Sequence, residues 1–245
     1  MIKNISGIVI SEVSYKENSK ILNVLTEDGI IGIISKGCKN IKSPLRTISE
    51  KLKYCEYTIY YKEDGLSTLK EGIVLDNFNN IRTDLTKISY LAYITELVSQ
   101  IVKQSNDKNI YKLYISTIKK IDEGLNPMVM TNILEIKLLD YLGVPINLNS
   151  CAKCGSKKNI ITIDPDIGGY ICTSCYTNEK MYDEKVRNML RKYYLVDIDS
   201  ITELKIKDYV IESINYFINT YYDRYTGLYI HSKNFLNRNI NYWLL

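Results

Sequence analysis

The first part of the chain alternates apolar and polar residues over short stretches, the pattern that predicts β-strands. Turn signals such as Glu27-Asp28-Gly29 and Glu63-Asp64-Gly65 separate these stretches. The five predicted strands cover residues 5–13, 20–26, 30–35, 54–61 and 66–75. Five short strands can close into a small antiparallel barrel. The OB-fold is the predicted form, and a small sandwich or an SH3-like barrel is the alternative.

From residue 81 onward, apolar residues recur at three- and four-residue spacing, which predicts helices. The predicted helices cover roughly residues 83–102, 110–121, 127–141, 184–195, 203–225 and 234–245. Thr83 or Asp84 can cap the first helix, Pro127 suits a helix start, and Gly143 suits a helix end. The pattern predicts an α+β multidomain protein. Its predicted parts are an OB-fold barrel (1–78), a helical bundle in two pieces (79–147 and 181–245) and an embedded module (148–180).

Composition allows a folded protein but says little about its function. Hydrophobic residues make up 45% of the 245 residues, which is ordinary for a globular chain. The net charge of +4 is only mildly basic, so local charge clusters must carry any argument about nucleic acid. The 22 tyrosines accompany abundant Ile, Lys and Asn, as A+T-rich coding DNA would give. Plain packing therefore explains them better than a base-stacking surface does.

Membrane and export signals are weak in this sequence. The densest apolar run, Ile30–Ile34, is far shorter than the ~20 residues that span a bilayer. The N-terminal stretch lacks the long apolar region and the cleavage site of a signal peptide. We therefore expect a cytoplasmic protein, in which thiols stay reduced and paired cysteines favour a metal over disulfides.

Four cysteines carry the clearest chemical signal. Cys151 and Cys154 form one C-x2-C pair, 17 residues follow, and Cys172 and Cys175 form a second pair. Two intervening residues let one tight turn direct both sulfurs at one metal ion, and two such pairs complete a tetrahedron. The sequence predicts a structural zinc ion, with an iron–sulfur cluster as the main alternative. The remaining cysteines, Cys38 and Cys55, are expected to be ordinary thiols.

The sequence offers no constellation for catalysis. Four thiolates would close the coordination shell of zinc, leaving no position for a reactive water. The sole histidine, His231, lies far along the chain, and the deaminase signature is absent. No phosphate-cradling P-loop and no Gly-x-Ser-x-Gly motif occurs. We therefore predict that the protein is not an enzyme.

A basic loop lies between the third and fourth predicted strands. Six cations stand there against Glu50 alone, which gives a local charge of +5. These cations are the predicted DNA-binding residues: Lys36, Lys39, Lys42, Arg46, Lys51 and Lys53. OB-folds bind nucleic-acid strands on a face flanked by such loops, so this position favours DNA binding. The alternative is a solvated lysine-rich loop without function.

These parts together resemble the RecO family of bacterial recombination mediators. The resemblance covers nearly the whole chain, and the order and spacing of its motifs make it specific. The motifs that carry it are Gly7-Ile-Val-Ile-Ser, Thr26-Glu-Asp-Gly29, Ser35-Lys-Gly37, Tyr93-Ile-Thr-Glu-Leu97, Glu135-Ile-Lys-Leu-Leu-Asp-Tyr-Leu-Gly143, Cys151-Ala-Lys-Cys-Gly155 and Gly168-Gly-Tyr-Ile-Cys172. This chain has Lys where many relatives have Arg in the basic loop, and Lys lacks the bidentate fork of Arg.

The resemblance implies an N-terminal OB-fold, a helical bundle and an embedded zinc module. It also implies a nucleoid-associated DNA repair protein that binds single- and double-stranded DNA and anneals strands. The partners it implies are RecR, the C-terminal tail of single-stranded-DNA-binding protein and, indirectly, the RecA filament. A second hypothesis, from the residues alone, is a non-catalytic interaction scaffold whose barrel binds protein rather than DNA.

Overall fold

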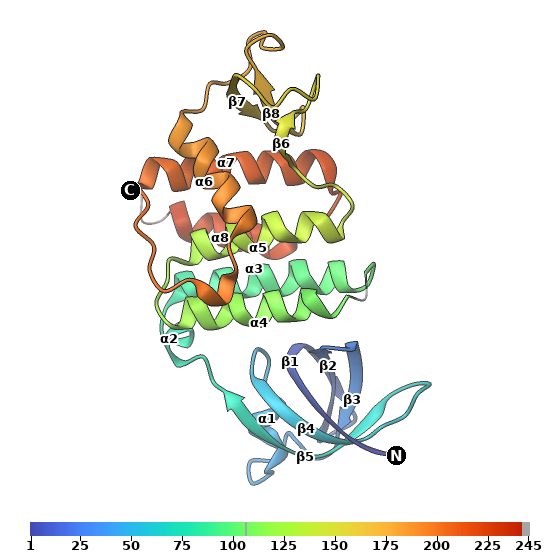
Figure 1. The fold of residues 1–245 in the computed structure, drawn as a ribbon. Coiled ribbons are helices and arrows are strands. Elements are labelled where there is room, and N and C mark those ends of the chain that lie inside the picture. Colours follow the sequence, from blue (N-terminus) through green and yellow to red (C-terminus); the bar gives the residue numbers. More distant parts are fainter. Residues whose placement is uncertain (106, 242–245) are drawn as a thin grey trace. The chain divides into compact units, whose positions relative to one another are not determined.

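The computed structural model describes residues 1–105 and 107–241 (Figure 1). The chain divides into two compact units, Met1–Ile115 and Ser116–Leu245. None of the described helices is long and apolar enough to cross a membrane.

A closed barrel of five strands forms most of the first unit. Its strands are β1 (Ile2–Tyr15), β2 (Ser19–Thr26), β3 (Gly29–Ser35), β4 (Tyr54–Tyr60) and β5 (Ser67–Asp76). They follow the order β1-β2-β3-β5-β4, and all neighbouring pairs are antiparallel except β3 and β5. The five-stranded, OB-like barrel predicted from the alternation is therefore confirmed. Each strand lies within three residues of its predicted ends, because turn residues set those ends.

The barrel interior is filled by every second residue of its strands. Leu22, Val24, Ile33 and Ile59 are all fully buried there. Gly72 on β5 is required by close packing, since a Cβ atom at this position would lie 2.6 Å from the carbonyl oxygen of Glu56. The β-branched and leucine residues of the predicted strands thus face one common core.

Short and long helices complete the first unit. They are α1 (Leu45–Ile48), α2 (Asn79–Arg82), α3 (Leu85–Val102) and the first half of α4 (Lys108–Asp122). The Asp84 carboxylate accepts hydrogen bonds from the N–H groups of Thr86 and Lys87, so Asp84 rather than Thr83 caps α3. The hydroxyl of Tyr111 donates to the Ser6 carbonyl at 3.2 Å, which joins α4 to β1.

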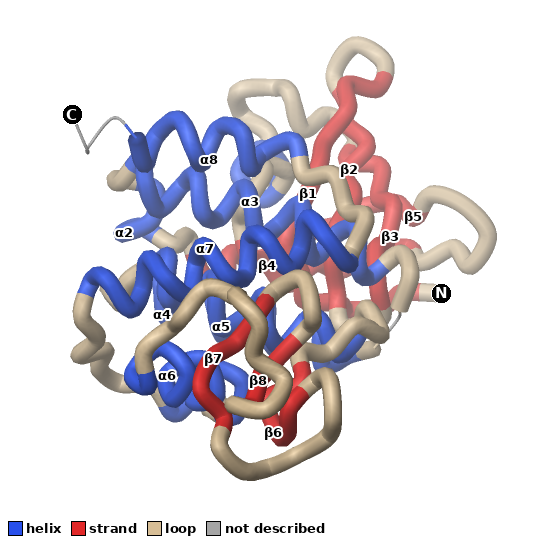
Figure 2. Tube along the Cα trace, turned by 90° about the horizontal axis from the view of Figure 1, so that it is seen from above, coloured by secondary structure: helices blue, strands red, loops and turns tan. Residues whose placement is uncertain are grey.

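The second unit combines helices with a small sheet (Figure 2). Its later helices are α5 (Pro127–Tyr141), α6 (Glu184–Leu195), the 3-10 turn η1 (Ile198–Ser200), α7 (Asp208–Tyr225) and α8 (His231–Asn241). The sheet has the order β6-β8-β7, with β6 at Asn147–Cys151, β7 at Ile160–Asp164 and β8 at Gly169–Cys172. Tyr222 is buried, and its hydroxyl donates to the Glu135 carbonyl at 2.8 Å, which shows how tyrosines serve packing here.

Two predicted helices have different limits in the structure. The helix predicted over 203–225 begins only at Asp208, and residues 201–207 are not helical. An acidic residue in the first turn stabilises the new start through the helix dipole. The last predicted helix, 234–245, is observed as α8 from His231, and residues 242–245 lie outside the described part. The four-part domain division remains a prediction.

Candidate metal centre and nucleic-acid interface

The small sheet of the second unit brings the four cysteines together. Cys151 ends β6 and Cys172 ends β8, and these two strands are neighbours in the sheet. Cys154 and Cys175 lie in the turns that follow, where the Cys175 N–H donates to the Cys172 carbonyl at 3.1 Å. Gly155 closes the first turn with a left-handed backbone, φ +75°, which glycine adopts without strain. Both C-x2-C pairs therefore reach the same point.

The geometry of the sulfurs suits a tetrahedral metal ion. All four Sγ atoms lie within 4.8 Å of one another, and those of Cys154 and Cys172 are 3.6 Å apart. A tetrahedron of Zn–S bonds near 2.3 Å places its sulfurs about 3.8 Å apart. Cys151 and Cys172 are buried, whereas Cys154 is exposed, so the centre lies at the edge of the module. These four residues could hold a metal ion, as the spacing predicted.

The protonation of the thiols also favours a cation here. Burial opposes ionisation of Cys151, but backbone N–H groups, that of Cys172 first, outweigh it and lower the pKa of the thiol to about 6. Hydrogen bonds with the other thiols, that of Cys154 first, raise the pKa of Cys175 to about 12. The Cys151 thiolate therefore forms readily, whereas Cys175 retains its proton in the absence of a cation. A bound divalent cation would favour the thiolate form of both residues.

The second cysteine turn is stabilised by an ion pair that the sequence did not predict. Lys153 donates to the Cys175 carbonyl at 3.1 Å and pairs with the carboxylate of Glu179. The same carboxylate accepts from the N–H of Thr177 at 2.8 Å. Lys153, first, and the Thr177 N–H lower the pKa of Glu179 to about 2. Lysines and glutamates are too common on surfaces for this pair to stand out in one sequence.

Cys38 and Cys55 lie outside the metal cluster. Both are buried in the first unit, and Cys55 belongs to the barrel core. Burial raises the pKa of the Cys55 thiol, which keeps it protonated. The prediction that these residues are ordinary thiols agrees with this position. His231 is exposed, with its ring edge-on to Tyr229 at a centroid distance of 4.8 Å.

Hydrogen bonds hold the basic loop of the first unit on the barrel. The N–H of Lys39 donates to the Asn18 carbonyl at 3.1 Å, which ties the loop to the turn between β1 and β2. Ser35 and Ser49 share a buried hydroxyl–hydroxyl bond of 2.8 Å that closes the loop across its base. The Tyr57 hydroxyl donates to the carbonyl of Ile48 at 3.1 Å, so α1 is fixed as well. The loop therefore has a defined shape.

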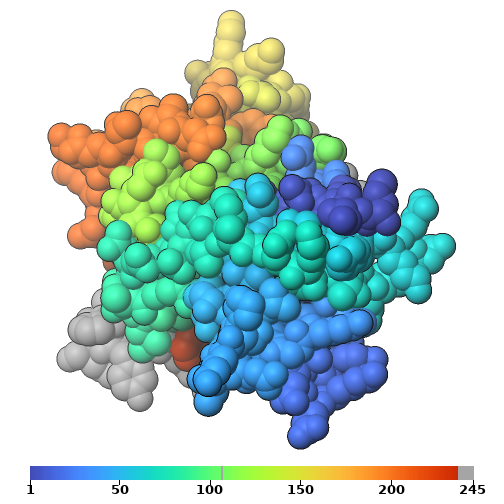
Figure 3. Space-filling view, turned by 90° about the horizontal axis from the view of Figure 1, so that it is seen from below, coloured from blue at the N-terminus to red at the C-terminus, as the bar shows by residue number. Residues whose placement is uncertain are grey.

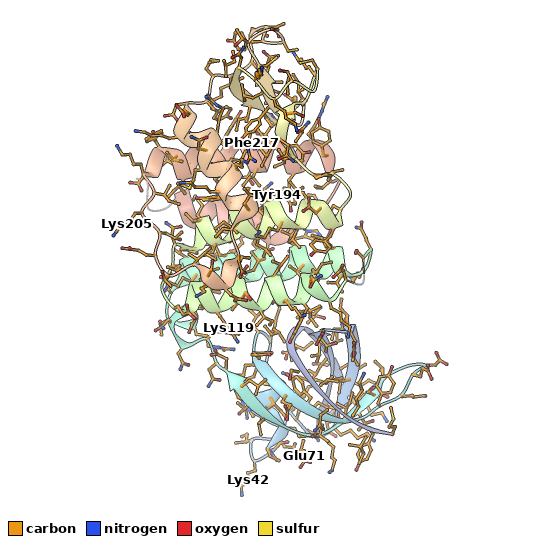
Figure 4. The ribbon with its side chains drawn as sticks, viewed as in Figure 1. Lys42, Glu71, Lys119, Tyr194, Lys205 and Phe217 are labelled. Carbon is orange, nitrogen blue, oxygen red and sulfur yellow. The ribbon has the colours of Figure 1, made fainter. Side chains whose placement is uncertain are left out.

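Five of the six predicted cations make no ion pair with a described residue. These five are Lys36, Lys39, Lys42, Arg46 and Lys51. All of them except the half-buried Lys39 are exposed. The light blue atoms of this segment spread over one face of the first unit (Figure 3), and Lys42 points away from the barrel (Figure 4). These cations can approach a polyanion without losing a protein partner.

Lys53 differs from the other five cations of the loop. Its side chain is buried, and its ammonium lies 2.9 Å from a carboxylate oxygen of Glu50. Residues two apart along a strand face the same side. Lys53 directly precedes β4 and comes two residues before the buried Cys55, so its side chain also faces inward. Charge counting along the sequence could not reveal this pairing. The candidate interface with nucleic acid therefore consists of the five unpaired cations.

Comparisons with known proteins all indicate the same family. Residues 1–78 match the family model described as Recombination protein O N terminal, and residues 82–234 match Recombination protein O C terminal. The DNA repair protein RecO of Listeria innocua serovar 6a is 31% identical over 242 residues, covering 97% of this chain and 94% of that protein. The protein of the same name from Halalkalibacterium halodurans is 29% identical over 243 residues, covering 97% and 95%. Bacillus pumilus has a further relative of that name, 29% identical over 237 residues and covering 95% and 92%.

Proposed function

The chain belongs to the RecO family of DNA repair proteins, and we propose on this premise that it acts as a non-catalytic recombination mediator. In this role it binds single- and double-stranded DNA, anneals complementary strands and, with RecR, promotes loading of RecA onto single-stranded DNA. One observation carries the proposal. An ordered loop on an OB-like barrel presents five cations that have no ion-pair partner among the described residues.

The cations act by neutralising phosphates. A bound lysine or arginine displaces counterions condensed on DNA, so binding gains free energy at low salt and loses it as salt rises. Lys42 and Arg46 are both exposed and lie four residues apart along the loop, so each is free to contact a phosphate of its own. These contacts carry no sequence information, which suits a mediator that must act on any damaged sequence.

We also propose that the four-cysteine cluster holds zinc as a structural ion. Zinc is favoured because thiolates are soft ligands and the four sulfurs lie within 4.8 Å of one another, close enough for one ion to bind them all. Four protein ligands leave no open position, so the ion would stabilise the module over 148–180 without taking part in chemistry.

A titration of DNA binding at two salt concentrations tests the proposed function. We expect labelled single strands and duplexes to bind at low salt, with an affinity that falls steeply as salt increases. Complementary strands should anneal faster in the presence of the protein. A protein that binds neither form of DNA at low salt would contradict the proposal.

A second candidate function is an interaction scaffold whose barrel binds protein. Ile73 and Leu75, which are 60% and 44% exposed on neighbouring outward positions of β5, favour it. Large apolar residues exposed side by side often mark protein contacts. The salt titration separates the two functions, because a scaffold of this kind would not bind DNA.

The partners implied by the family can be tested one at a time. We expect the helical part to bind a peptide with the acidic, apolar-ended sequence of the C-terminal tail of single-stranded-DNA-binding protein. Apolar grooves with cationic rims recognise such tails. Calorimetry at low salt should detect binding, and a scrambled peptide of equal charge serves as the control. Equal affinity for both peptides, or no heat with either, would exclude a specific tail site.

Membership of this family also supports proposals on where the protein acts in the cell and on its division into domains. Cytoplasmic, nucleoid-associated localisation follows from a role on chromosomal DNA. Division into parts at 1–78, 79–147, 148–180 and 181–245 follows from the change of pattern along the sequence, and limited proteolysis would test it.

A further inference from the structure

The small sheet of the second unit does not restrain the four cysteines equally. Cys151 and Cys172 are buried at the ends of β6 and β8, two neighbouring strands. Cys154 lies in the tight turn that directly follows β6. Cys175 comes three residues after β8, and residues 176–183 form neither helix nor strand. The position of Cys175 therefore depends on contacts outside the sheet.

A side chain from the first cysteine pair reaches across to the second pair. Lys153 lies between Cys151 and Cys154 in the sequence, but its ammonium donates to the Cys175 carbonyl at 3.1 Å. The same ammonium pairs with the carboxylate of Glu179, four residues beyond Cys175. One side chain thus connects both cysteine turns by a route that does not pass through the metal position. We call Lys153 and Glu179 the lysine clamp.

Glu179 is a well-defined partner for this lysine. Its side chain is only 7% exposed, compared with 31% for that of Lys153. One carboxylate oxygen accepts from the Thr177 hydroxyl at 2.9 Å, and the other accepts from the Thr177 N–H at 2.8 Å. A carboxylate so nearly buried needs a cation and hydrogen bonds to offset its lost hydration. Loss of the Lys153 ammonium would therefore leave a charge that favours opening of this segment.

The chain directly after Glu179 is tied to the sheet. Thr162 on β7 is fully buried, and its hydroxyl donates to the Lys180 carbonyl at 2.6 Å and accepts from the Tyr182 N–H at 3.0 Å. Tyr182 is itself buried, with its ring edge-on to that of Phe217 on α7. None of these contacts involves a cysteine, so they can position Glu179 whether or not a metal ion is bound.

We propose that the lysine clamp holds Cys175 in its ligating position and thereby slows release of the metal ion. This inference rests on the proposed zinc site and concerns how that site stays occupied. Because four thiolates close the coordination shell, a chelator can reach the ion only after one sulfur moves away. Cys175 is the ligand that the sheet restrains least, so its departure is the step that the clamp opposes. Contacts that hold metal ligands in position typically change metal affinity by about 10- to 100-fold.

Transfer of zinc from the full chain to an excess of a colorimetric chelator measures the release rate. Lys153→Met keeps an unbranched side chain but removes the ammonium, and it should speed release by about tenfold. The zinc content before the chelator is added should stay at about one ion per chain, because all four ligands remain. Lys153→Arg keeps a cation with several donor groups and should release zinc nearly as slowly as the parent.

Glu179→Gln tests the other half of the clamp and should also speed release. The double variant with Lys153→Met should release zinc no faster than Lys153→Met alone, because both changes break the same contact. The matched control is Lys157→Met, at an exposed lysine of the same module that forms no ion pair with a described residue. It removes an equal charge and should leave the release rate unchanged.

The inference is overturned if zinc leaves the Lys153→Met variant at the parental rate, or if Lys157→Met accelerates release equally. Effects of the two clamp changes that multiply in the double variant would also overturn it, because Lys153 and Glu179 would then act separately. So would a Lys153→Arg variant that releases zinc as fast as Lys153→Met. A parent protein that contains no zinc would instead refute the proposed metal site itself.

Discussion

If the cluster holds zinc as proposed, replacement of Cys172 by serine is expected to abolish metal binding and to unfold the module around the cluster. Cys172 is buried, its sulfur lies 3.6 Å from that of Cys154, and its N–H donates to the sulfur of Cys151. The change therefore removes one of four ligands at the centre of the cluster. Structural zinc sites bind with roughly 10–16 kcal/mol, whereas a typical point mutation costs about 1 kcal/mol. Metal analysis and thermal unfolding measure both effects.

The control for this change is Cys38→Ala, which removes a buried thiol outside the cluster. It should keep about one metal ion per chain. Wild-type protein prepared without chelators that contains no zinc would refute the zinc proposal. Iron with visible absorbance in its place would indicate an iron–sulfur cluster, which four cysteines can also hold.

The periodicity of the sequence predicted most of the fold. Alternating residues identified the five strands, because each strand has one side in the barrel core, as Leu22 and Val24 do. Local turn chemistry set most element ends: Asp84 caps α3 and Asn126 caps α5. The α6 limits of 184 and 195 were predicted to the residue. Where the local signal was weak, as before Asp208, the predicted helix began five residues too early.

The small sheet around the cysteines could not be predicted from periodicity. Its strands are four or five residues long, and β8 is buried along its whole length, so it shows no alternation. The spacing of the cysteines predicted their convergence without the sheet. Tertiary contacts, absent from any sequence window, then decided the details, such as the pairing of Lys153 with Glu179.

In the basic loop, the availability of each charge could not be predicted from the sequence either. Its six cations look equivalent in sequence, but Lys53 is buried against Glu50 and the others are not. Only the structure reveals that this loop adjoins the turn between β1 and β2, because the Lys39 N–H donates to the Asn18 carbonyl. The sequence therefore indicates a charged segment, and the fold determines which of its charges are available.

Replacement of Lys39, Lys42 and Arg46 together by alanine is expected to weaken DNA binding for all sequences alike. Removing one cation from a phosphate should reduce the slope of log affinity against log salt by roughly one unit, hence by about three units for the triple change. Strand annealing should fail in parallel, because it requires DNA strands held on the protein. The fold should persist, since Lys42 and Arg46 are exposed and the loop is anchored through backbone and serine groups. Such surface changes usually alter stability by ~0.5 kcal/mol or less.

The matched control removes the same charges from the second unit, as Lys157, Lys158 and Arg191 to alanine. These residues are exposed, and no ion pair with another described residue involves them. Anisotropy titrations of one labelled oligonucleotide at several salt concentrations give the slopes of the parent and both variants. If net charge alone attracted DNA, both triples would weaken binding equally, because long-range attraction depends little on where three charges lie. If only the loop variant loses DNA affinity, and its affinity depends less on salt than that of the parent, the loop cations must contact phosphates directly. A loop variant that binds like the parent would leave these cations as solvated surface charge.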